Sequence, residues 1–436
     1  MRRYVLILLG CVCVAMPAPG GAADAPKITF GGEIRMRGYR LDNMFDFNDS
    51  SDRDQWTAFR LRTSAHARID AGEGITGFIQ IANQNYGEGV SASMADQWEE
   101  DNKSNKFFVD NAYIHLDHLS GLPVSARLGR QNLKYGSGFV LFDGQSQYAS
   151  TSIYFDGVKV IAHIHERVRL DLLWFKDQEN NRDDESNDDI TLAGAYLLSS
   201  QQHPFDSQEL YLLNREDELL GKNIQLYGIR LAGTSESGLA YSAECGIQRG
   251  DFTESVDQEA LGVKLDLSYT LRHVTARPSL ILGYVALSGD DPATTGVNEA
   301  WDVFYGGWPQ FGDLLAWKYV NTGGSNVISR YDPGYNAGSS TGGEAVYSNV
   351  TLATVGFGTT LFDKFSARAT WSKLTIDETV DGIDDDFGDY YQLTLKYPYS
   401  PNLSFAVYAA LIDPGAAFEE GADPAVEAFW ETRFFF

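Results

Sequence analysis

The fold is decided by the stretch from Phe108 to Ile161, which contains AYIHL at 112–116, RLGRQNLKYG at 127–136 and YFDGVKV at 154–160. Each block alternates polar and apolar side chains, which is typical of a β-strand with one face in water and the other against an apolar medium. The middle block also places two arginines and a lysine within eight residues. The stretch therefore predicts amphipathic strands whose polar face carries positive charge.

The same alternation continues outward from this stretch in both directions and predicts an even number of strands, eighteen in all. In the first of them, Ile34 and Met36 lie on one face, while Arg35 and Arg37 lie on the other. The predicted strands are 27–41, 56–69, 75–84, 108–117, 123–132, 153–164, 168–176, 190–198, 208–214, 222–232, 239–248, 258–270, 276–287, 346–360, 365–375, 389–397, 403–411 and 426–436.

The links between these strands distinguish a soluble sandwich, whose apolar faces pack inward, from a membrane barrel, whose apolar faces meet lipid. Long and short links alternate along the chain, apart from an irregular region around 199–221. Outer-membrane barrels have short periplasmic turns and longer outside loops, and tilted strands of about ten residues cross the hydrocarbon layer. We therefore predict an all-β chain that forms a transmembrane antiparallel β-barrel of about 18 strands, with short periplasmic turns and long extracellular loops.

The first residues match a secretory signal. Arg2 and Arg3 precede an apolar run that ends at Met16, and the small residues Gly21-Ala22-Ala23 supply a cleavage site. An alternative is a lipoprotein site at 8–11, but the apolar run before it is short for that purpose. We predict a signal peptide at 1–23 and a location in the bacterial outer membrane.

The composition of the remaining chain limits the classes of protein to which it can belong. Cleavage leaves Cys245 as the last cysteine, which excludes an internal disulfide and a cysteine metal site. It also changes the formal charge from −26 to −28, because the removed segment carries only two arginines, and so strong a negative charge argues against nucleic acid as a partner. No apolar run of 18 residues follows residue 23. We predict one barrel domain, 24–436, in which 288–345 is a long extracellular or constriction loop.

The end of the chain agrees with this prediction. Trp430, Phe434 and the terminal Phe436 share one face of the last strand, with Glu431 and Arg433 on the other. This arrangement resembles the carboxy-terminal assembly signal of bacterial outer-membrane barrels. The alternative, an ordinary edge strand of a soluble protein, would expose three phenylalanines and favour aggregation.

Acidic residues concentrate in the long links. The range 177–189 holds seven Asp or Glu among thirteen residues, against the single base Arg182. The plain interpretation is a set of solvated loops that like charge keeps soluble. The alternative is that divalent cations bridge the carboxylates, although no complete calcium-loop motif is present.

Basic residues instead fall on the polar faces of strands. A charge that faces lipid at mid-depth costs about 2–4 kcal/mol, so these side chains are expected to point into the lumen. Arg130 has the wrong parity, and we expect a β-bulge at Gly129 to turn it inward. The candidate residues of an anion pathway are Arg35, Arg37, Arg60, Arg62, Arg127, Arg130, Lys159, Arg230 and Arg368.

Rings of such cations lower the energy of an anion that passes through a narrow lumen. The alternative is that they pair with lumenal acids and leave no net field. The candidate acids are Glu33, Glu244, Asp266, Glu427 and Glu431.

Several short motifs follow one another along the chain in a particular order. The chain contains Ala112-Tyr113-Ile114, Gly129-Arg130-Gln131, Tyr135-Gly136 and Phe155-Asp156-Gly157-Val158, and then 227–233, 288–290 and 411–415. This order resembles the alginate-export porin family over the whole barrel. The resemblance implies an eighteen-stranded outer-membrane barrel with an arginine-rich, anion-selective lumen through which a uronate polysaccharide leaves the cell. It also implies pathway roles for Arg130 and Arg230, which match the arginines of the Gly-Arg-Gln and Gly-x-Arg-Leu motifs, and more loosely for Arg60 and Arg62.

In the alginate exporter a longer periplasmic segment is expected to cover the lumen entrance, whereas every predicted periplasmic link here is short.

The longest link carries the aromatic residues Trp301, Tyr305 and Trp308. Such a loop is expected to fold into the barrel mouth as a constriction, or to bind sugar rings by stacking. The alternative is a self-packed cap over the rim.

We find no motif of an enzyme. A nucleophile elbow, a phosphate-binding glycine loop and a zinc motif are all missing from the sequence, and the pair His163 and His165 is too small a set for a metal site. We predict no catalytic activity, no cofactor and no metal.

The leading functional prediction is an outer-membrane channel for passive passage of an anionic oligo- or polysaccharide, or of small anions. Its expected partners are outer-membrane lipid, the anionic saccharide and periplasmic export proteins. The alternatives are a plugged barrel that serves as an anchor or docking protein, a general or uptake porin, and a barrel enzyme.

Overall fold

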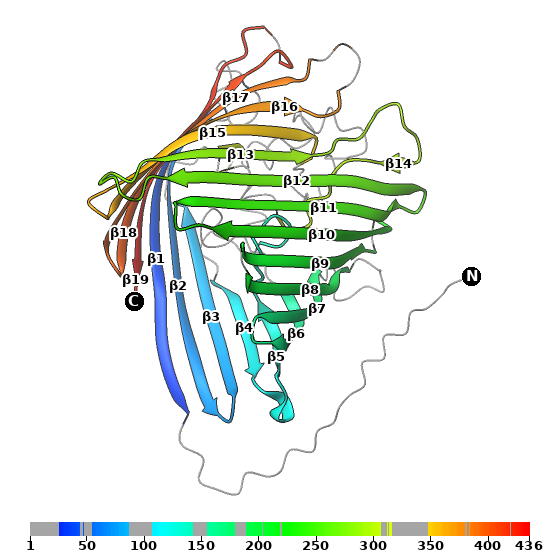
Figure 1. Cartoon of the computed structure of the whole chain (residues 1–436), viewed down its shortest axis with the longest axis vertical. Coiled ribbons are helices and arrows are strands. Elements are labelled where there is room, and N and C mark those ends of the chain that lie inside the picture. Colours follow the sequence, from blue (N-terminus) through cyan, green and yellow to red (C-terminus); the bar gives the residue numbers. More distant parts are fainter. Residues whose placement is uncertain are drawn as a thin grey trace, which may run out of the picture.

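The chain forms a closed antiparallel β-barrel (Figure 1). The computed structural model describes residues 26–43, 47, 55–86, 107–142, 155–178, 189–202, 204–218, 220–306, 312, 314–315, 348–379, 382, 384–418 and 420–436. The barrel closes where β1 (Lys27–Asp42) pairs with β19 (Ala425–Phe435), the last strand of the chain. Closure leaves no unpaired sheet edge, as a membrane barrel requires.

Eighteen strands make the wall, and each pairs with its neighbour in the sequence. Between β1 and β19 they are β2 (Trp56–Gly72), β3 (Ile75–Tyr86), β4 (Phe107–Leu116), β5 (Val124–Gln131), β6 (Phe155–His165), β7 (Val168–Gln178), β8 (Ile190–Gln202), β9 (Phe205–Asp217), β10 (Lys222–Thr234), β11 (Leu239–Thr253), β12 (Val256–Thr270), β13 (Ser279–Leu287), β15 (Val350–Leu361), β16 (Phe365–Ile376), β17 (Asp386–Ser400) and β18 (Leu403–Pro414). The two-residue β14 (Val297–Asn298) belongs to the long link and pairs in parallel with β12.

All eighteen predicted strands are confirmed, but two predicted outside links are wrong. The links expected at 215–221 and 249–257 are tight turns, because the strands on either side pair as far as 217 and 222, and as far as 253 and 256. The irregular link at 199–207 likewise shrinks to 203–204. Alternation marks only the part of a strand that faces two different media, whereas backbone hydrogen bonds continue beyond it.

The apolar face of the wall is on the outside of the barrel. On β1, Ile34 and Met36 are 43% and 38% exposed, whereas Arg35 and Arg37, which point into the lumen, are 1% and 2% exposed. This orientation is the reverse of a soluble sandwich, in which the apolar side chains pack together between sheets. It places hydrocarbon where the apolar side chains are exposed.

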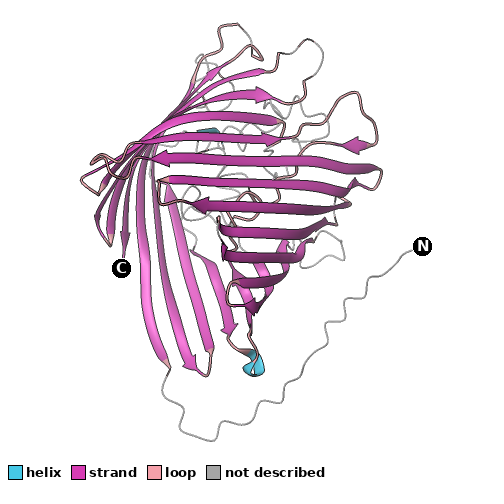
Figure 2. Cartoon of the chain, viewed as in Figure 1, coloured by secondary structure: helices cyan, strands magenta, loops and turns pink. Residues whose placement is uncertain are grey.

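Secondary structure other than strand is scarce among the described residues (Figure 2). The 3₁₀-helix η2 (Leu119–Gly121) forms the turn between β4 and β5. No helix in this part of the chain has the length and apolar character to cross a bilayer. The short links 73–74, 117–123, 166–167, 203–204, 235–238, 271–278, 362–364 and 401–402 lie at one end of the barrel, which we call the short-turn end. The opposite end, with the links 87–106, 132–154 and 288–349, is the long-loop end.

Candidate functional site

A ladder of arginines lines the lumen where the barrel closes. The strand register places Arg433, Arg35 and Arg62 side by side on β19, β1 and β2. The next inward-facing rung along the same strands holds Glu431, Arg37 and Arg60. Like charges opposite one another on a sheet repel, so this ladder requires carboxylates nearby.

Three acids supply that compensation. Glu33 lies 3.3 Å from Arg62 and 2.5 Å from Arg433, and Glu431 lies 2.6 Å from Arg37. Asp110 is fully buried, with its carboxylate 3.4 Å from Arg62. Arg37, Arg62 and Arg433 of the ladder thus each lie within 3.4 Å of a carboxylate.

Asp110 was not predicted. The pairing of β3 with β4 shifts between Gln80 and Ile81, so that Asp110 is the extra residue of a β-bulge. Asp110 and Asn111 are consequently both buried, although they are neighbours in the sequence. The signal that could have found the bulge is this polar pair inside an otherwise alternating strand.

A second basic group crosses β4 to β7. His115, Arg127 and Lys159 are directly opposite one another on three adjacent strands. The buried carboxylate of Asp171 on β7 lies 3.2 Å from Lys159 Nζ and 2.9 Å from Arg169 Nε. This part of the wall holds more cations than acids among the described residues.

Arg230 lies in a third group, on β10. Its guanidinium is 2.5 Å from Glu209 on β9 and 3.6 Å from Glu244 on β11. Lys264 on β12 lies 3.8 Å from Asp266. Four of the candidate acids therefore lie near lumenal cations, namely Glu33, Glu244, Asp266 and Glu431. This agrees with the alternative prediction, in which the lumenal cations pair with lumenal acids.

Arg130 does not lie in the lumen, and the expected bulge at Gly129 is wrong. The register of β5 continues through Gly129 without a shift on both neighbouring strands, so Arg130 keeps the outward parity of Leu128. Its guanidinium donates two hydrogen bonds, of 2.8 and 2.6 Å, to Asp156 on β6. Because Asp156 has the same outward parity, this bidentate pair neutralises the charge outside, and no bulge is needed.

A segment of the β5–β6 link enters the barrel, which the sequence did not predict. We call residues 133–142 the crossing segment. Tyr135 donates a 2.7 Å hydrogen bond to Asp171, and Ser137 donates a 3.1 Å hydrogen bond to Glu244. Between them, Gly136 (φ +53°) lies so close to the wall that an added Cβ would be 2.8 Å from Arg230. The crossing segment is therefore attached to the acids of the lumen wall.

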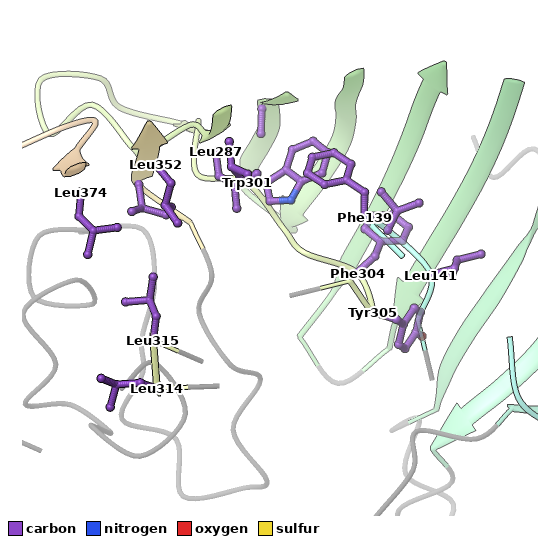
Figure 3. Packing of buried hydrophobic residues seen from close by; sticks show 14 of the residues in the cluster. Phe139, Leu141, Leu287, Trp301, Phe304, Tyr305, Leu314, Leu315, Leu352 and Leu374 are labelled. Atoms are coloured by element: carbon purple, nitrogen blue, oxygen red, sulfur yellow. The ribbon is translucent and has the colours of Figure 1, made fainter. Parts of the chain in front are cut away.

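The long link also folds inward and meets the crossing segment (Figure 3). The amide of Phe142 donates to the carbonyl of Tyr305 at 3.2 Å, and the amide of Tyr305 donates to Val140 at 3.0 Å. Phe139 and Trp301 stack with ring centroids 5.6 Å apart. Together with inward-facing strand residues they form an apolar cluster that fills part of the lumen.

Trp301 lies in a slot made by two glycines. Gly246 on β11 and Gly262 on β12 are directly opposite each other, and a Cβ on either would be 2.8 Å from the indole. Trp301 and Tyr305 are 3% and 6% exposed. The described part of the loop therefore packs inside the barrel, as a constriction does, and these two rings contact protein. Trp308 lies outside the described residues, as does the expected signal peptide 1–23.

Asp302 attaches the same loop to the wall at the long-loop end. Its carboxylate lies 3.2 Å from Arg215 on β9 and 3.2 Å from Lys222 on β10, and it accepts a 2.8 Å hydrogen bond from the amide of Phe304. Burial alone would raise the pKa of Asp302, but the two cations and the amide outweigh it and lower the pKa to about 2.

This pKa makes the stability contribution of Asp302 dependent on pH. Because the pKa in the folded barrel lies below the value of about 3.9 of an unfolded Asp, the contribution is present above pH 4 and is lost as the pH falls through about 2. We expect a contribution of about 2–3 kcal/mol at neutral pH. Urea unfolding in detergent should show this loss below pH 4 in the wild type and not in Asp302→Asn; a loss complete by pH 5 would contradict the assignment.

A cavity of about 980 Å³ remains open beside β12, β13, β15 to β19 and β1. Gly312 of the long link lies at this cavity, where an added Cβ would be 2.7 Å from the Tyr390 hydroxyl. Among the described residues that line it, two are acids, Asp266 and Glu431, and six are cations, namely Arg37, Lys264, Lys364, Arg368, Lys396 and Arg433. Of the predicted pathway residues, the structure places Arg37 and Arg368 at this cavity, and Arg35, Arg60, Arg62, Arg127, Lys159 and Arg230 on other inward-facing positions of the wall.

Comparisons with known proteins agree on the architecture. The family model described as alginate export matches residues 27–431. No curated protein matches the sequence. Similar solved structures include OccK9 (OpdG) of Pseudomonas aeruginosa, with a TM-score of 0.60 and 11% identity over 94% of this chain and 98% of that one. OccK2 (OpdF) of P. aeruginosa in complex with glucuronate has a TM-score of 0.55 and 11% identity, with the same coverage. The outer membrane protein OprD of P. aeruginosa has a TM-score of 0.54 and 12% identity over 96% and 95% of the two chains. At these identities the solved structures show the fold alone.

Proposed function

The chain belongs to the alginate export family, and from this premise we propose that it is an outer-membrane channel whose lumen selects anions and passes carboxylate-bearing saccharides. The observation that carries this proposal is the cavity of about 980 Å³, whose described lining has six cations and two acids. A site with this excess, enclosed by low-dielectric walls, concentrates anions and repels cations.

The paired charges elsewhere in the lumen support the same function in a different way. Arg62 and Arg230 each lie near two carboxylates, so they contribute little net field. These ion pairs stabilise the polar wall of the lumen, because a buried charge without a partner is energetically costly. Four of the six cations at the cavity, Lys264, Lys364, Arg368 and Lys396, lie outside the arginine ladder, and they give the cavity its excess of positive charge.

Uronates are the substrate class that we favour. Each sugar of a uronate chain carries one carboxylate and several hydroxyl groups, which suits a cavity that presents both guanidinium and ammonium donors. The cavity volume is at the upper end of the range for small-molecule sites, about 300–1,000 Å³, which is room for a few sugar units. Glucuronate, which is named for one of the similar barrels, is a uronate.

The orientation follows the rule for outer-membrane barrels, in which short turns face the periplasm and long loops face the exterior. Outer-membrane lipid would then cover the exposed apolar face, and periplasmic export proteins would meet the short-turn end. The channel needs no cofactor or catalytic group, because a gradient drives passive passage.

Purified protein in planar bilayers tests the proposal. With a salt gradient across the bilayer, we expect discrete conductance and a reversal potential displaced toward the chloride equilibrium potential, because the cavity carries excess positive charge. Micromolar to millimolar trigalacturonate should interrupt the current. Maltotriose, a neutral trisaccharide of the same length, is the matched control and should not. A preference for cations would refute the proposed selectivity.

A plugged barrel that serves as an anchor or docking protein is the second candidate. The observation that favours it is the apolar cluster of the crossing segment and Trp301, which fills part of the lumen. Silent bilayers, together with a stable co-purifying partner, would support this candidate over the channel.

A further inference from the structure

We propose that Lys364, Arg368 and Lys396 form an anion-capture site at the short-turn end of the cavity, and that they make the channel electrically polar, so that carboxylated chains bind faster from this end than from the long-loop end. This inference rests on the proposed channel function and adds to it the entrance and the residues that define it.

The three cations gather on one part of the wall. Lys364 is in the turn between β15 and β16, and Arg368 lies four residues further along on β16. Arg368 is opposite Thr394 of β17, and Lys396 is opposite Ser366, so Arg368 and Lys396 are diagonal neighbours on the inner face. Diagonal neighbours have Cα atoms about 7–8 Å apart, which lets two cations contact one carboxylated sugar chain.

All three side chains are exposed and line the cavity. Within the described part of the chain, no carboxylate lies at ion-pair distance from any of them. Asp363, which directly precedes Lys364, instead forms an ion pair of 2.5 Å with Arg277. Arg37 and Arg433 line the same cavity but lie beside Glu431 and Glu33. Lys364, Arg368 and Lys396 are therefore the lining cations best able to exchange water for a ligand carboxylate.

At the short-turn end, the positively charged turns of the rim lie beside the capture site. We call this part of the wall, from β12 to β17, the basic sector. The β12–β13 and β15–β16 turns together carry Arg272, Arg277 and Lys364 against one acid, Asp363. The two turns are adjacent, because Thr360 of β15 donates its backbone amide to the carbonyl of Ala276 in the β12–β13 turn at 2.9 Å. The turns that precede it in the chain carry mostly acids, namely Glu73, Asp117, Glu166 and Glu236, against Arg167. An anion that approaches from this end is therefore directed toward the capture site.

At the long-loop end, the links of the basic sector are acidic. Asp377 accepts a 3.0 Å hydrogen bond from the amide of Gly289, and Asp290 accepts a 2.9 Å hydrogen bond from the amide of Glu299. These contacts bring Asp290, Asp291, Glu299, Asp377 and Glu378 together from two links of the long-loop end. Burial and the neighbouring carboxylates both raise the pKa of Glu378, which agrees with their proximity.

The two ends therefore differ in sign along one route. An anion meets attraction at the short-turn end and repulsion at the long-loop end, so its association rate should depend on the side from which it is added. The gradient still sets the net direction of passive passage, and the charge asymmetry sets which side captures the substrate. Because exposed charges act through water, the asymmetry should disappear at high salt.

The experiment measures the block of single channels by trigalacturonate added to one side at a time, with the protein inserted from one chamber. In 0.1 M KCl we expect the association rate to be about tenfold higher from the short-turn side, and nearly equal on both sides in 1 M KCl. The triple variant Lys364→Gln, Arg368→Gln, Lys396→Gln should lower the rate from the short-turn side about tenfold and leave the other side unchanged.

Lys373→Gln is the matched control, because Lys373 is on the same strand but faces outward, paired with Asp386 at 2.7 Å. This variant should behave as the wild type. Equal association rates from both sides at low salt, or an unchanged rate in the triple variant, would overturn the capture site while leaving an anion-selective channel in place. A silent or cation-selective protein would overturn the capture site and the proposed function together.

Discussion

Replacing Arg62 by methionine is expected to lower the free energy of unfolding of the barrel by about 3–5 kcal/mol, because it removes the charged partner of buried carboxylates. The Arg62 side chain is 1% exposed, and its guanidinium lies 3.4 Å from Asp110 and 3.3 Å from Glu33. Glu33 keeps Arg433 at 2.5 Å, so Asp110, which is fully buried, is the group most affected. Urea unfolding in detergent micelles, followed by the heat-dependent gel shift of the folded barrel, measures the loss.

Two further variants separate loss of charge pairing from loss of packing. The double variant Arg62→Met, Asp110→Asn should recover a large part of the lost stability, because it removes the uncompensated carboxylate as well. Arg40→Gln is the control on the same sheet, since the Arg40 side chain is 75% exposed and lies 3.9 Å from Asp42; such surface pairs contribute at most about 1 kcal/mol. An Arg62→Met barrel as stable as the wild type would contradict the role assigned to the ladder.

Replacing Trp301 by alanine is expected to raise single-channel conductance and to lower the free energy of unfolding by about 3–5 kcal/mol. The indole packs against Gly246 and Gly262 and stacks on Phe139, so its removal leaves a large void where the long link is attached to the wall. The loop and the crossing segment should then separate from the wall, and more of the lumen should conduct. Conductance in planar bilayers checks the first effect, and urea unfolding checks the second.

The glycine slot allows the same test by a second route. In Gly262→Val the new Cβ would lie 2.8 Å from the indole, so Trp301 is displaced although it is still present. We expect an increase in conductance similar to that of Trp301→Ala. Trp371→Ala is the matched control, because Trp371 is 39% exposed on the outer face and should leave conductance unchanged. If neither variant altered conductance, Trp301 would not be what holds the loop in the lumen.

The lumen thus has two kinds of charge with separate consequences. At Arg62 and Arg230, cations lie among buried acids, so their replacement should act mainly on stability. At Arg368 and Lys396, cations face open space, so their replacement should act mainly on anion passage. The sequence presented both kinds as arginines or lysines on polar strand faces, and parity alone does not separate them.

The strand number, the strand order and the orientation of the two faces were determined by the sequence alone. The physical reason is that a strand between lipid and a lumen must alternate with a period of two, so the pattern of Ile34, Arg35, Met36 and Arg37 specifies which side chain faces which medium. The same constraint does not act where both faces are wet, and there the predicted strand ends at 248 and 258 were wrong.

The pairing of the charges was decided only by the tertiary structure. Arg37 meets Glu431, which is 394 residues away, because the barrel closes between its first and last strands. Arg130 stays outside because Asp156 across the strand pair neutralises it, and Asp110 turns inward because of a bulge. Trp301 enters the lumen because two opposed glycines leave a slot for its ring. Each of these outcomes depends on which residues become neighbours across strands and links, and such neighbours exist only once the sheet has closed.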